Sequence, residues 1–289
     1  MNRSYNTYHF FQKRYTEIGG KIKPFQLYRC IRVNTKKISS ENLKKRLLNR
    51  GFDLEKIPFV PHGFRILKEP FNLVSCPEYL LGLFYIQDAA SQLPAQILSP
   101  RELVLDACAA PGGKTCQLAS MANVIAVDNN KQRFQKLRLN LERLGIDNCI
   151  AYNMDFLKIQ TCFNYILLDA PCSGNYMLES RWFEKNTLQR ITERSQLQKR
   201  LVAHAISLLN PGGILVYSTC SLEPEEDECV VQYALDTFPI KLEKINCIGD
   251  PGLTTAFQYH FDESMRYCRR LWPDKTETIG FFIARLKKC

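Results

Sequence analysis

From about residue 71 onward, short apolar runs alternate with polar, helix-like stretches and Gly-rich turns. The strand-like runs stand in ELVLDACAAPGGK, NVIAVDNN, CIAYNMDF, NYILLDAPCSG and ILVYSTC, and a helix is expected over roughly residues 186–209. Strands and helices in alternation build a parallel sheet with helices on both faces, because each parallel crossover needs a helix-length connection. The sequence therefore predicts an α/β fold with a Rossmann-like sheet over residues 71–289.

A smaller α+β module is expected over residues 1–70, ahead of the sheet. Its YRCIRVNTKK stretch reads as a strand leading into a polar turn, and FDLEKIPFVPHGFRIL reads as short strands broken by prolines. Between them, SSENLKKRLLNRG has Ser39 or Ser40 as a helix N-cap and Gly51 as a stop signal. A length of 289 residues fits two domains at about 100–200 residues each.

The positive charge of the chain is concentrated in its first quarter. Residues 1–70 hold 16 Lys and Arg against 5 Asp and Glu, whereas residues 71–289 hold 23 against 24. A basic module attached to a near-neutral body indicates a polyanion held by one part and processed by the other. The simpler interpretation is a solvated basic face, and charge alone does not distinguish nucleic acid from an anionic membrane.

The sequence contains no signal for membrane insertion. No apolar run approaches the roughly 20 residues of a membrane span, and MNRSYNTYHFFQKRY at the N-terminus lacks the apolar core of a signal peptide. We therefore expect a cytoplasmic protein without membrane contact, and a monomer is the default expectation.

The spacing of the twelve cysteines and four histidines indicates neither a metal site nor a disulfide framework. No Cys-x-x-Cys pair occurs and the histidines lie far apart, so no metal is expected. Most of these cysteines read as small buried or incidental thiols. Cys172 and Cys220 differ, because each stands where a predicted strand ends.

Polar residues follow the predicted strands at the points where they end. Asp106, Asp128, Asp155, Asp169 and Cys220 fall at such positions. In an open α/β sheet, ligands bind at the carboxyl ends of the strands. A single acidic residue there could be a helix N-cap, but five polar groups at one sheet edge favour a binding or catalytic site.

The turn DACAAPGGKT after the first strand matches neither of the common phosphate-binding loops. A Walker loop needs glycine where the chain has Cys108, although Gly113, Lys114 and Thr115 match. A dinucleotide loop needs three glycines in Gly-x-Gly-x-x-Gly spacing, and only Gly112 and Gly113 are present. A P-loop NTPase and an NAD-binding site are therefore disfavoured.

The remaining features fit a nucleoside ligand without a pyrophosphate. Asp128 lies 22 positions after Asp106 at the end of the next strand, where a carboxylate can accept both ribose hydroxyls. Asp155 is placed to accept a hydrogen bond from an adenine amino group. Small residues let the backbone approach such a ligand closely, and they are Ala109, Ala110, Gly112 and Gly113. S-adenosylmethionine suits this pattern better than NAD.

The two strand-end cysteines add a nucleophile to this pattern. Cys172 follows Pro171 in a turn, and Cys220 follows Thr219 where the strand stops. A thiol has an unperturbed pKa of about 8.5, and the small thiolate fraction at neutral pH is already strongly nucleophilic. One thiol makes a covalent reaction path possible, and a second thiol allows the two residues to take different catalytic roles.

Several stretches together resemble the RNA (cytosine-5) methyltransferases of the Sun (Fmu) family. They are DACAAPGGKT, DAPCSG, YSTCS with the acidic residues after it, YIQDAASQLPAQIL, IRVNTKK and RYCRRLWPDKTETIGFFIARLKK, so the resemblance covers nearly the whole chain. The length and DAPCSGN are similar to the compact archaeal-type tRNA methyltransferases, which lack an added RNA-binding PUA domain. The resemblance implies a Rossmann-like S-adenosylmethionine-dependent methyltransferase sheet and RNA as the partner, with tRNA favoured and rRNA as the alternative.

The resemblance also implies roles for individual residues. Asp128 would hold the ribose of S-adenosylmethionine, and Asp155 its adenine. Asp169 would lie close to both the cofactor and the target base, and Arg133 near the cofactor. The loop that cradles the methionine and ribose would consist of Cys108, Ala109, Ala110, Pro111, Gly112, Gly113 and Lys114.

Within this family, Cys220 would be the catalytic nucleophile and Cys172 would help release the product. In DNA cytosine methyltransferases a Pro-Cys turn like Pro171-Cys172 carries the nucleophile, so the reverse assignment stays open, while the second thiol in YSTCS favours Cys220. The basic residues 1–70 would dock the RNA.

Two other functions and one other site are weighed against this interpretation. An amino-group methyltransferase typically has an Asp/Asn-Pro-Pro-aromatic turn, and DAPCS lacks the aromatic residue. A non-catalytic RNA-binding or assembly factor that keeps the fold predicts lost cysteines or a broken loop, and both are intact. The EPEEDE run after Cys220 is expected to be a helix N-terminus, where the macrodipole favours negative charge, rather than a metal site.

Overall fold

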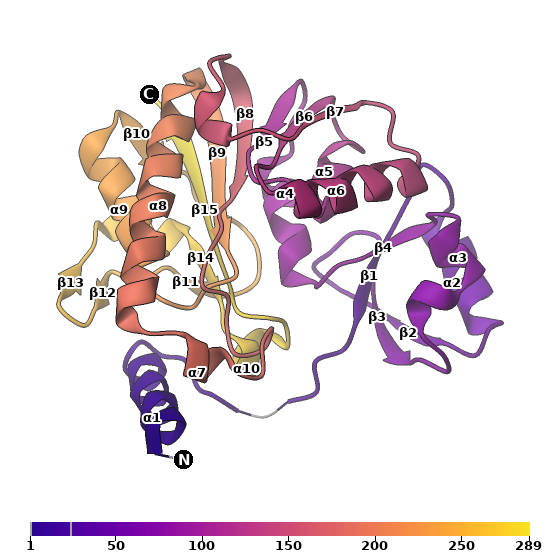
Figure 1. The fold of residues 1–289 in the computed structure, drawn as a ribbon, viewed down its shortest axis with the longest axis horizontal. Helices are drawn as coiled ribbons and strands as arrows, with labels where there is room; N and C mark the ends of the chain where they lie inside the picture. Colours follow the sequence, from indigo (N-terminus) through magenta and orange to yellow (C-terminus); the bar gives the residue numbers. More distant parts are fainter. Residues whose placement is uncertain (1, 24) are drawn as a thin grey trace. The chain divides into compact units, whose positions relative to one another are not determined.

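The computed structural model describes residues 2–23 and 25–289, which form two compact units (Figure 1). Unit 1 comprises Met1–Leu27 and Gln160–Cys289, and unit 2 comprises Tyr28–Ile159. The chain therefore enters unit 2 once and returns to complete unit 1.

A boundary near Pro70 coincides with neither unit. The antiparallel sheet of unit 2 continues beyond Pro70 into β4 (Phe84–Ile86), and residues 1–27 belong to unit 1. The net charge of the sequence changes at Pro70, but no compact unit ends there. The burial of apolar side chains, rather than charge, decides which segments pack together.

Unit 2 begins with a four-stranded antiparallel sheet in the order β2-β3-β1-β4. Besides β4, its strands are β1 (Cys30–Val33), β2 (Asp53–Lys56) and β3 (Gly63–Lys68). Helix α2 (Ser40–Leu48) follows Ser39, whose side chain accepts a hydrogen bond from the Asn42 amide, so Ser39 is the N-cap. The short helices η1 (Leu73–Ser75) and α3 (Pro77–Leu80) precede β4.

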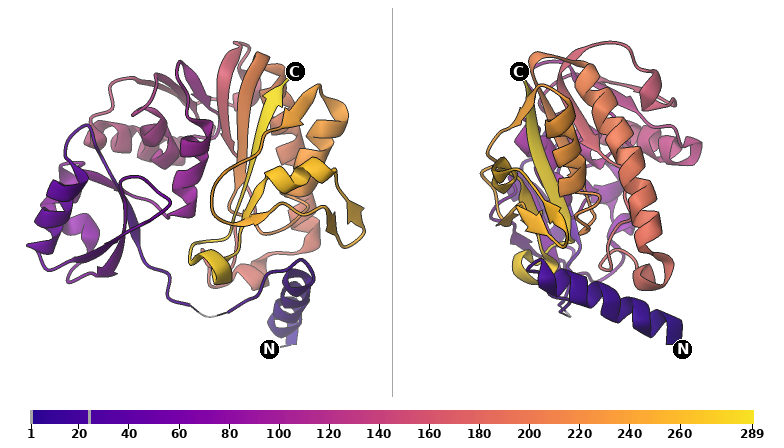
Figure 2. Two further views of the ribbon diagram at one scale, coloured as in Figure 1. Left: turned by 180° about the vertical axis from the view of Figure 1, so that it is seen from behind. Right: turned by 90° about the vertical axis from the view of Figure 1, so that its left-hand side faces the viewer.

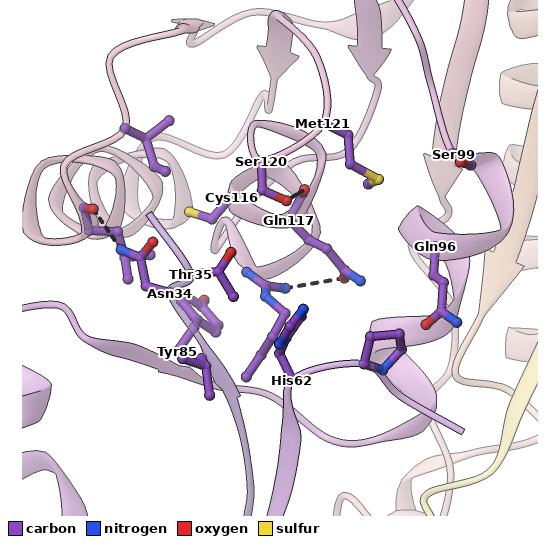
Figure 3. Close-up of a pocket in the computed structure, with 15 residues that line it drawn as sticks. Asn34, Thr35, His62, Tyr85, Gln96, Ser99, Cys116, Gln117, Ser120 and Met121 are labelled. Atoms are coloured by element: carbon purple, nitrogen blue, oxygen red, sulfur yellow. Dashed lines mark hydrogen bonds between the residues drawn. The ribbon is translucent and has the colours of Figure 1, made fainter. Parts of the chain in front are cut away.

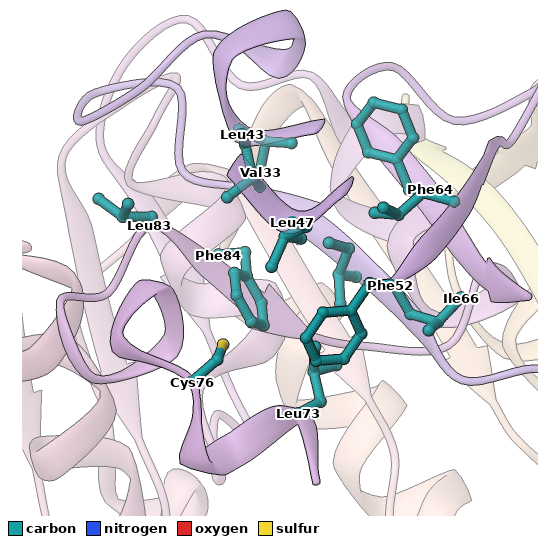
Figure 4. Close-up of a cluster of buried hydrophobic side chains, with 12 residues drawn as sticks. Val33, Leu43, Leu47, Phe52, Phe64, Ile66, Leu73, Cys76, Leu83 and Phe84 are labelled. Carbon is teal, nitrogen blue, oxygen red and sulfur yellow. The ribbon is translucent and has the colours of Figure 1, made fainter. Parts of the chain in front are cut away.

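One face of this antiparallel sheet carries a hydrophobic core (Figure 4). The buried side chains of this core are Ile31, Val33, Leu43, Leu47, Phe52, Leu54, Phe64, Ile66, Leu73, Cys76, Leu83 and Phe84. Because successive side chains of a strand point to opposite faces, Arg32 leaves the core that its neighbours Ile31 and Val33 enter. Tyr85, the β4 partner of Arg32, does the same. The second face of the sheet therefore carries a buried arginine beside an aromatic ring.

The rest of unit 2 holds three parallel strands in the order β5-β6-β7. They are β5 (Val104–Asp106), β6 (Val124–Val127) and β7 (Cys149–Tyr152). Helices α5 (Gly113–Leu118) and α6 (Lys131–Leu144) connect the strands, η2 (Ala90–Gln92) and α4 (Leu93–Leu98) precede them, and η3 (Phe156–Lys158) follows. The carboxyl ends of all three strands share one edge, as the βαβ pattern requires.

Unit 1 contains a sheet of mixed strand direction. β8 (Phe163–Asp169) and β9 (Leu209–Thr219) run parallel, whereas β15 (Phe281–Lys288) pairs antiparallel with β9, and β14 (Arg269–Leu271) with β15. The shorter strands are β10 (Ile240–Leu242), β11 (Asp250–Pro251), β12 (Thr255–Ala256) and β13 (Tyr259–His260). The predicted parallel sheet thus gains an antiparallel part, because β14 and β15 are joined by too short a connection for a parallel crossover.

Helices α8 (Leu188–Ser207) and α9 (Glu228–Thr237) lie side by side against one face of this sheet (Figure 2). α8 corresponds to the helix expected over 186–209, with Thr187 as its N-cap. Residues 210–213, between the expected helix and the ILVYSTC run, form the first part of β9. The shorter helices are α7 (Trp182–Lys185), η4 (Glu263–Tyr267) and α10 (Pro273–Thr276).

Helix α1 (Asn2–Glu17) packs into unit 1 through its apolar side chains. The buried cluster that it joins contains Phe11, Tyr15, Ile18, Trp182, Ile191, Leu222, Ala256 and Trp272. None of the helices in the described part of the chain is both long enough and apolar enough to span a membrane.

Candidate active site

Two neighbouring parallel strands of unit 1 bring the two predicted thiols together. β8 ends at Asp169 ahead of the turn that carries Cys172, and β9 ends at Thr219, directly before Cys220. The two Sγ atoms lie 3.2 Å apart, within reach of a thiol hydrogen bond. Both cysteines are half-buried, so the pair lies at the sheet edge with access to solvent.

Asp169 occupies the last position of β8, close to the same turn. Its Oδ1 accepts a hydrogen bond of 2.7 Å from Ser218 Oγ on β9. Ser218 stands directly opposite Asp169 in the parallel register, so the strand pairing itself holds this carboxylate at the edge.

The surroundings of Cys172 favour its protonated form. Its hydrogen bond with Cys220, its burial, and repulsion from a Cys220 thiolate and from Glu226 raise the pKa of Cys172 well above its usual range. Cys172 therefore keeps its proton at neutral pH and can donate it toward the Cys220 sulfur.

Two buried side chains that the sequence reasoning missed hold the backbone on either side of the thiols. Asn175 Nδ2 donates to the carbonyl oxygens of Cys220, at 2.7 Å, and Gly280, at 3.0 Å. Trp182 Nε1 donates to the Ser173 carbonyl at 2.8 Å. The only sequence feature that pointed to Asn175 was its place in the DAPCSGN stretch.

The acidic run after Cys220 is buried among cations. Its members are Glu223, Glu225, Glu226, Asp227 and Glu228. Arg14 forms ion pairs with the first two, at 2.9 and 2.8 Å, and Arg270 forms ion pairs with the last two, at 3.0 and 2.6 Å. The run does lead into helix α9, which starts at Glu228. Within the described residues, no group of His, Cys, Asp and Glu is arranged to hold a metal ion.

In unit 2, Asp128 directly follows β6 and contacts the loop after β5. Its Oδ2 accepts a hydrogen bond from the Ala110 amide at 3.1 Å, and its Oδ1 accepts one from the Asn130 amide at 2.9 Å. Arg133 Nη2 lies 3.8 Å from the carboxylate and donates to the Ala110 carbonyl. A carboxylate offers about four acceptor sites, so Asp128 can still accept from ribose hydroxyls.

Two glycines let the loop between β5 and α5 pass close to its neighbours. Gly112 has a φ of +108°, and a Cβ there would stand 2.9 Å from Leu137 Cδ1. At Gly113, the first residue of α5, a Cβ would stand 3.0 Å from Tyr85 Cε1. Larger residues at either position would displace the loop. Cys108 and Lys114, at the two ends of the loop, are partly exposed.

The other two predicted aspartates of unit 2 make local contacts. Asp106, at the end of β5, is buried and accepts a 2.7 Å hydrogen bond from the Thr115 hydroxyl in α5. Asp155 follows β7 and caps η3, because its Oδ1 accepts from the Leu157 amide at 3.0 Å. This is the contact of a helix-capping aspartate, and the partly exposed Asp155 carboxylate keeps acceptor sites for a ligand.

Arg32 is a buried support of the same loop that the sequence reasoning also missed. Its Nη1 donates to the Gly113 carbonyl at 2.8 Å and to the side-chain oxygens of Gln87 and Gln117, at 2.5 and 3.1 Å. Burial lowers the pKa of Arg32 to about 10, so the guanidinium is still charged at neutral pH. Arg32 lies in the IRVNTKK stretch, where nothing in the spacing distinguishes it from a surface arginine.

A cavity of about 370 Å³ lies within unit 2 (Figure 3). Figure 3 shows Tyr85, His62 and Gln117 around this space, and Arg32 also lines it. No residue of the predicted cofactor loop and none of the predicted aspartates is among its lining residues. The predicted cofactor residues therefore do not line the cavity, although Arg32, which donates to the Gly113 carbonyl of that loop, does.

Two family descriptions match most of the chain. Residues 95–287 match the family described as 16S rRNA methyltransferase RsmB/F, and residues 11–89 match the N-terminal domain of 16S rRNA methyltransferase RsmF. The first match alone covers more than half of the chain.

Two solved structures share the fold over nearly the whole chain. A methyltransferase homolog protein from Pyrococcus horikoshii superposes with a TM-score of 0.83 at 44% identity, over 92% of this chain and 88% of that one. NSun6 from Pyrococcus horikoshii, solved with SFG, superposes with a TM-score of 0.82 at 25% identity, over 99% of this chain and 97% of that one.

Curated relatives are named as methyltransferases of tRNA and of rRNA. The tRNA (cytosine(49)-C(5))-methyltransferase of Pyrococcus abyssi is 37% identical over 273 residues, which are 89% of this chain and 87% of that protein. Four rRNA methyltransferases, from Schizosaccharomyces pombe, human, mouse and Vibrio atlanticus, are 34–37% identical, but the chain spans only 34–58% of their length. The chain thus belongs to the RsmB/F family of RNA methyltransferases, and it has the S-adenosylmethionine-dependent methyltransferase fold with a small N-terminal antiparallel module.

Proposed function

We propose that this protein transfers a methyl group from S-adenosylmethionine to carbon 5 of cytosine in RNA, with tRNA as the substrate. The observation that carries the proposal is the pair of thiols 3.2 Å apart where two parallel strands end. The choice of tRNA is supported by the Pyrococcus abyssi relative, which the chain matches over 87% of its length. The rRNA names of the other relatives make rRNA the alternative.

The thiols answer a specific chemical problem. Carbon 5 of cytosine is too weak a nucleophile to take a methyl group directly, so a Cys220 thiolate adds to carbon 6 and converts the ring into an enamine. Asp169, at the end of β8, shares a proton with ring nitrogen 3 and offsets the charge that develops there. The target base must leave its stack to reach these groups.

Cys172 serves the release step. After methylation, a base removes the proton from carbon 5, the carbon–sulfur bond at carbon 6 breaks, and its electron pair returns to the Cys220 sulfur. Cys172 keeps its proton and lies 3.2 Å from that sulfur, so it stabilises the departing thiolate by a hydrogen bond. This division of roles makes Cys220 the nucleophile and Cys172 the residue that assists release.

The residues of unit 2 fit S-adenosylmethionine, which supplies an electrophilic methyl group when bound. The loop Cys108–Lys114 passes close to Leu137 at Gly112, where an added Cβ would clash with the leucine side chain. Asp128 has acceptor sites left for ribose hydroxyls, and Asp155 has them for an amino group. Arg133 contacts both the Asp128 carboxylate and the Ala110 carbonyl, and so it holds the carboxylate and the loop backbone in a fixed relative position.

The basic residues 1–70 supply the docking surface for RNA in this proposal. Lys45, Lys56 and Lys68 are exposed and form no ion pair with another described residue. Exposed lysines of this kind neutralise phosphates and release counterions, which gives affinity without sequence preference.

Incubation with methyl-labelled S-adenosylmethionine tests the reaction. The protein is mixed separately with bulk tRNA and bulk rRNA, and the RNA is digested to nucleosides. We expect label in 5-methylcytidine from tRNA. Label confined to rRNA would replace the tRNA assignment, and no 5-methylcytidine in either pool would refute the proposed reaction.

Single-cysteine variants test the roles of the thiols. Cys220→Ala is expected to form no covalent RNA–protein adduct, because the nucleophile is absent. Cys172→Ala is expected to accumulate the adduct, because release is impaired. Both are read on a denaturing gel with labelled RNA and S-adenosylmethionine, and the opposite pattern would exchange the two roles.

A further inference from the structure

One buried carboxylate joins the two turns that carry the thiols. Glu226, between β9 and α9, is fully buried. Its Oε1 accepts from the Ser173 amide at 3.0 Å, and its Oε2 accepts from the hydroxyls of Ser173, at 2.5 Å, and Ser221, at 2.6 Å. Ser173 directly follows Cys172, and Ser221 directly follows Cys220. A single side chain therefore binds both turns one residue beyond each sulfur.

We propose that Glu226 is the positioning residue of the thiol pair: its carboxylate fixes the two turns so that the sulfurs of Cys172 and Cys220 stay in contact. The catalytic meaning of this inference rests on the proposed methyl transfer. The contact between the sulfurs, in contrast, is a property of the protein alone and can be measured without RNA or cofactor. Glu226 touches no reacting atom in this role and acts through the backbone of the two turns.

Two of the groups around Glu226, the Ser173 amide and Gln198 Nε2, can only donate a hydrogen bond. Gln198 Nε2 also donates to Oε1, at 3.1 Å, and the same nitrogen donates to the Pro171 carbonyl at 3.0 Å. Four donors thus converge on one carboxylate, which offers about four acceptor sites. An amide at this position would turn an NH₂ group toward some of these donors. The match between donors and acceptors explains how a carboxylate is tolerated where an unsatisfied charge would cost several kcal/mol.

Glu226 also differs from its neighbours in the acidic run. Those neighbours are paired with Arg14 or Arg270, whereas Glu226 forms no ion pair with any described residue. Its bonds go to hydroxyl, amide and carboxamide donors beside the thiols. No cation among the described residues pairs with the Glu226 carboxylate, and repulsion from its charge is one of the causes that raise the pKa of Cys172.

The first test measures the thiol contact in the full-length protein without substrate. A short bifunctional thiol reagent, dibromobimane, is added, and the bridged Cys172–Cys220 peptide is quantified by mass spectrometry, because the chain has 12 cysteines. Glu226→Gln is compared with wild type and with the matched control Glu225→Gln, whose residue pairs with Arg14 instead of the turns. We expect the bridging rate to fall about tenfold in Glu226→Gln only, since two reacting groups lose their fixed proximity.

The second test measures turnover on the RNA that wild type methylates. A misplacement of about 1 Å costs on the order of 100-fold in rate, so kcat of Glu226→Gln should fall about 100-fold. The KM values for RNA and for S-adenosylmethionine should stay within about twofold of wild type, because the variant leaves the binding residues in place. A change in KM without a change in kcat would contradict a positioning role.

The outcomes separate this inference from the proposed reaction. If folded Glu226→Gln bridges and turns over like Glu225→Gln, the positioning role is overturned even though the wild type methylates RNA. If the wild type methylates no RNA but Glu226→Gln bridges more slowly, the reaction fails and the positioning role stands. Should circular dichroism show Glu226→Gln to be unfolded, Ser221→Ala removes the 2.6 Å bond to Glu226, together with the 3.1 Å bond that Ser221 Oγ accepts from the Glu223 amide and its 3.5 Å contact with Ser173 Oγ. An unchanged bridging rate in Ser221→Ala would then overturn the inference.

Discussion

Buried donors hold the backbone beside each reactive part of the site. Asn175 donates to the Cys220 carbonyl in unit 1, and Arg32 donates to the Gly113 carbonyl in unit 2. Removing either donor leaves a carbonyl without its partner, which costs about 1–3 kcal/mol when the group is buried. The reactive residues therefore depend on residues that have no chemistry of their own.

Arg32→Ala is expected to weaken both the fold and the cofactor site. The variant removes three hydrogen bonds and leaves the Gly113 carbonyl and two glutamine oxygens without this donor. We expect the free energy of unfolding to fall by on the order of 2–3 kcal/mol in urea titrations. The Kd for S-adenosylmethionine, measured by calorimetry, should rise about tenfold, which corresponds to about 1.4 kcal/mol.

Arg29→Ala is the matched control for that variant. Arg29 lies three residues earlier, is 45% exposed at its side chain, and pairs with Glu69 on the surface. Exposed ion pairs contribute about 0–1 kcal/mol, so both quantities should stay near wild type. Equal losses in the two variants would show that Arg32 has no special role in supporting the loop.

The same residues show how far sequence reasoning reaches. Asp128 and Cys220 could be predicted because each follows a strand-like run, and the ends of parallel strands meet at an edge. Arg32 could not be predicted, because its partner Gly113 stands 81 positions away and no periodicity links the two. Glu226 was read as part of a helix N-terminus, since composition does not show whether an acidic run is buried.

At the scale of elements, the segment that connects β9 to α9 is rich in acidic residues whose side chains are buried. Two arginines from distant elements form ion pairs with four residues of the acidic run, Arg14 from α1 and Arg270 from β14. Burial nevertheless raises the pKa of Glu223 to about 7, although the charge of Arg14 acts in the opposite direction. The pKa values of Glu226 and Asp227 are raised as well, with burial as the main cause.

Raised pKa values predict a stability that falls as pH rises. The unfolded chain releases the Glu223 proton near pH 4.3, whereas the folded protein keeps it until about pH 7. The stabilisation is therefore complete below pH 4.3 and is lost as pH rises through 7. Between pH 5 and 8, we expect Glu223→Gln to remove a pH-dependent change in the free energy of unfolding on the order of 2 kcal/mol, measured by urea titration. Parallel pH profiles for wild type and variant would contradict the assignment.

Elements with a regular pattern were predicted better than their pairing. Helices α2 and α8 have capping residues at Ser39 and Thr187 and a clear apolar spacing, so their positions follow from local sequence. β15 is a plain apolar run, and such a run fits either strand direction. Its antiparallel pairing with β9 is decided by the connection to β14 and by the space beside β9, which local sequence does not encode.

At the scale of the whole molecule, the charge of the first quarter is divided between the two units. Residues 1–27 pack into unit 1, where Arg14 is used in buried ion pairs, and residues 28–70 belong to unit 2. The sequence located the excess charge, but packing decides which cations remain free for a polyanion. Lys45, Lys56 and Lys68 remain exposed.

RNA affinity should therefore depend on salt through these lysines. With about six phosphates contacted, the logarithm of affinity for single-stranded RNA should fall against the logarithm of salt with a slope near −4. Changing Lys45, Lys56 and Lys68 to Gln removes up to three contacts at about 0.7 each, which brings the slope to about −2. Fluorescence anisotropy at several salt concentrations measures both slopes.

Three exposed lysines outside this region provide the control. Lys158, Lys241 and Lys244 changed to Gln alter the net charge of the protein equally. If the first 70 residues dock the RNA, the control keeps the wild-type slope. Matching slopes in the two triple variants would place the docking surface elsewhere.

The division of unit 1 into two chain segments sets an order of events during synthesis. Residues 1–27 leave the ribosome before unit 2, but the residues that cover Phe11 and Tyr15 in α1 come from the segment Gln160–Cys289. At about 5–20 residues per second, the intervening 132 residues of unit 2 take roughly 7–26 s to appear. During that interval, and until residues 160–289 follow, the apolar side of α1 has no native partner, whereas unit 2 is complete before those residues appear. The completion of unit 1 therefore depends on helix α1 staying unaggregated while unit 2 is synthesised.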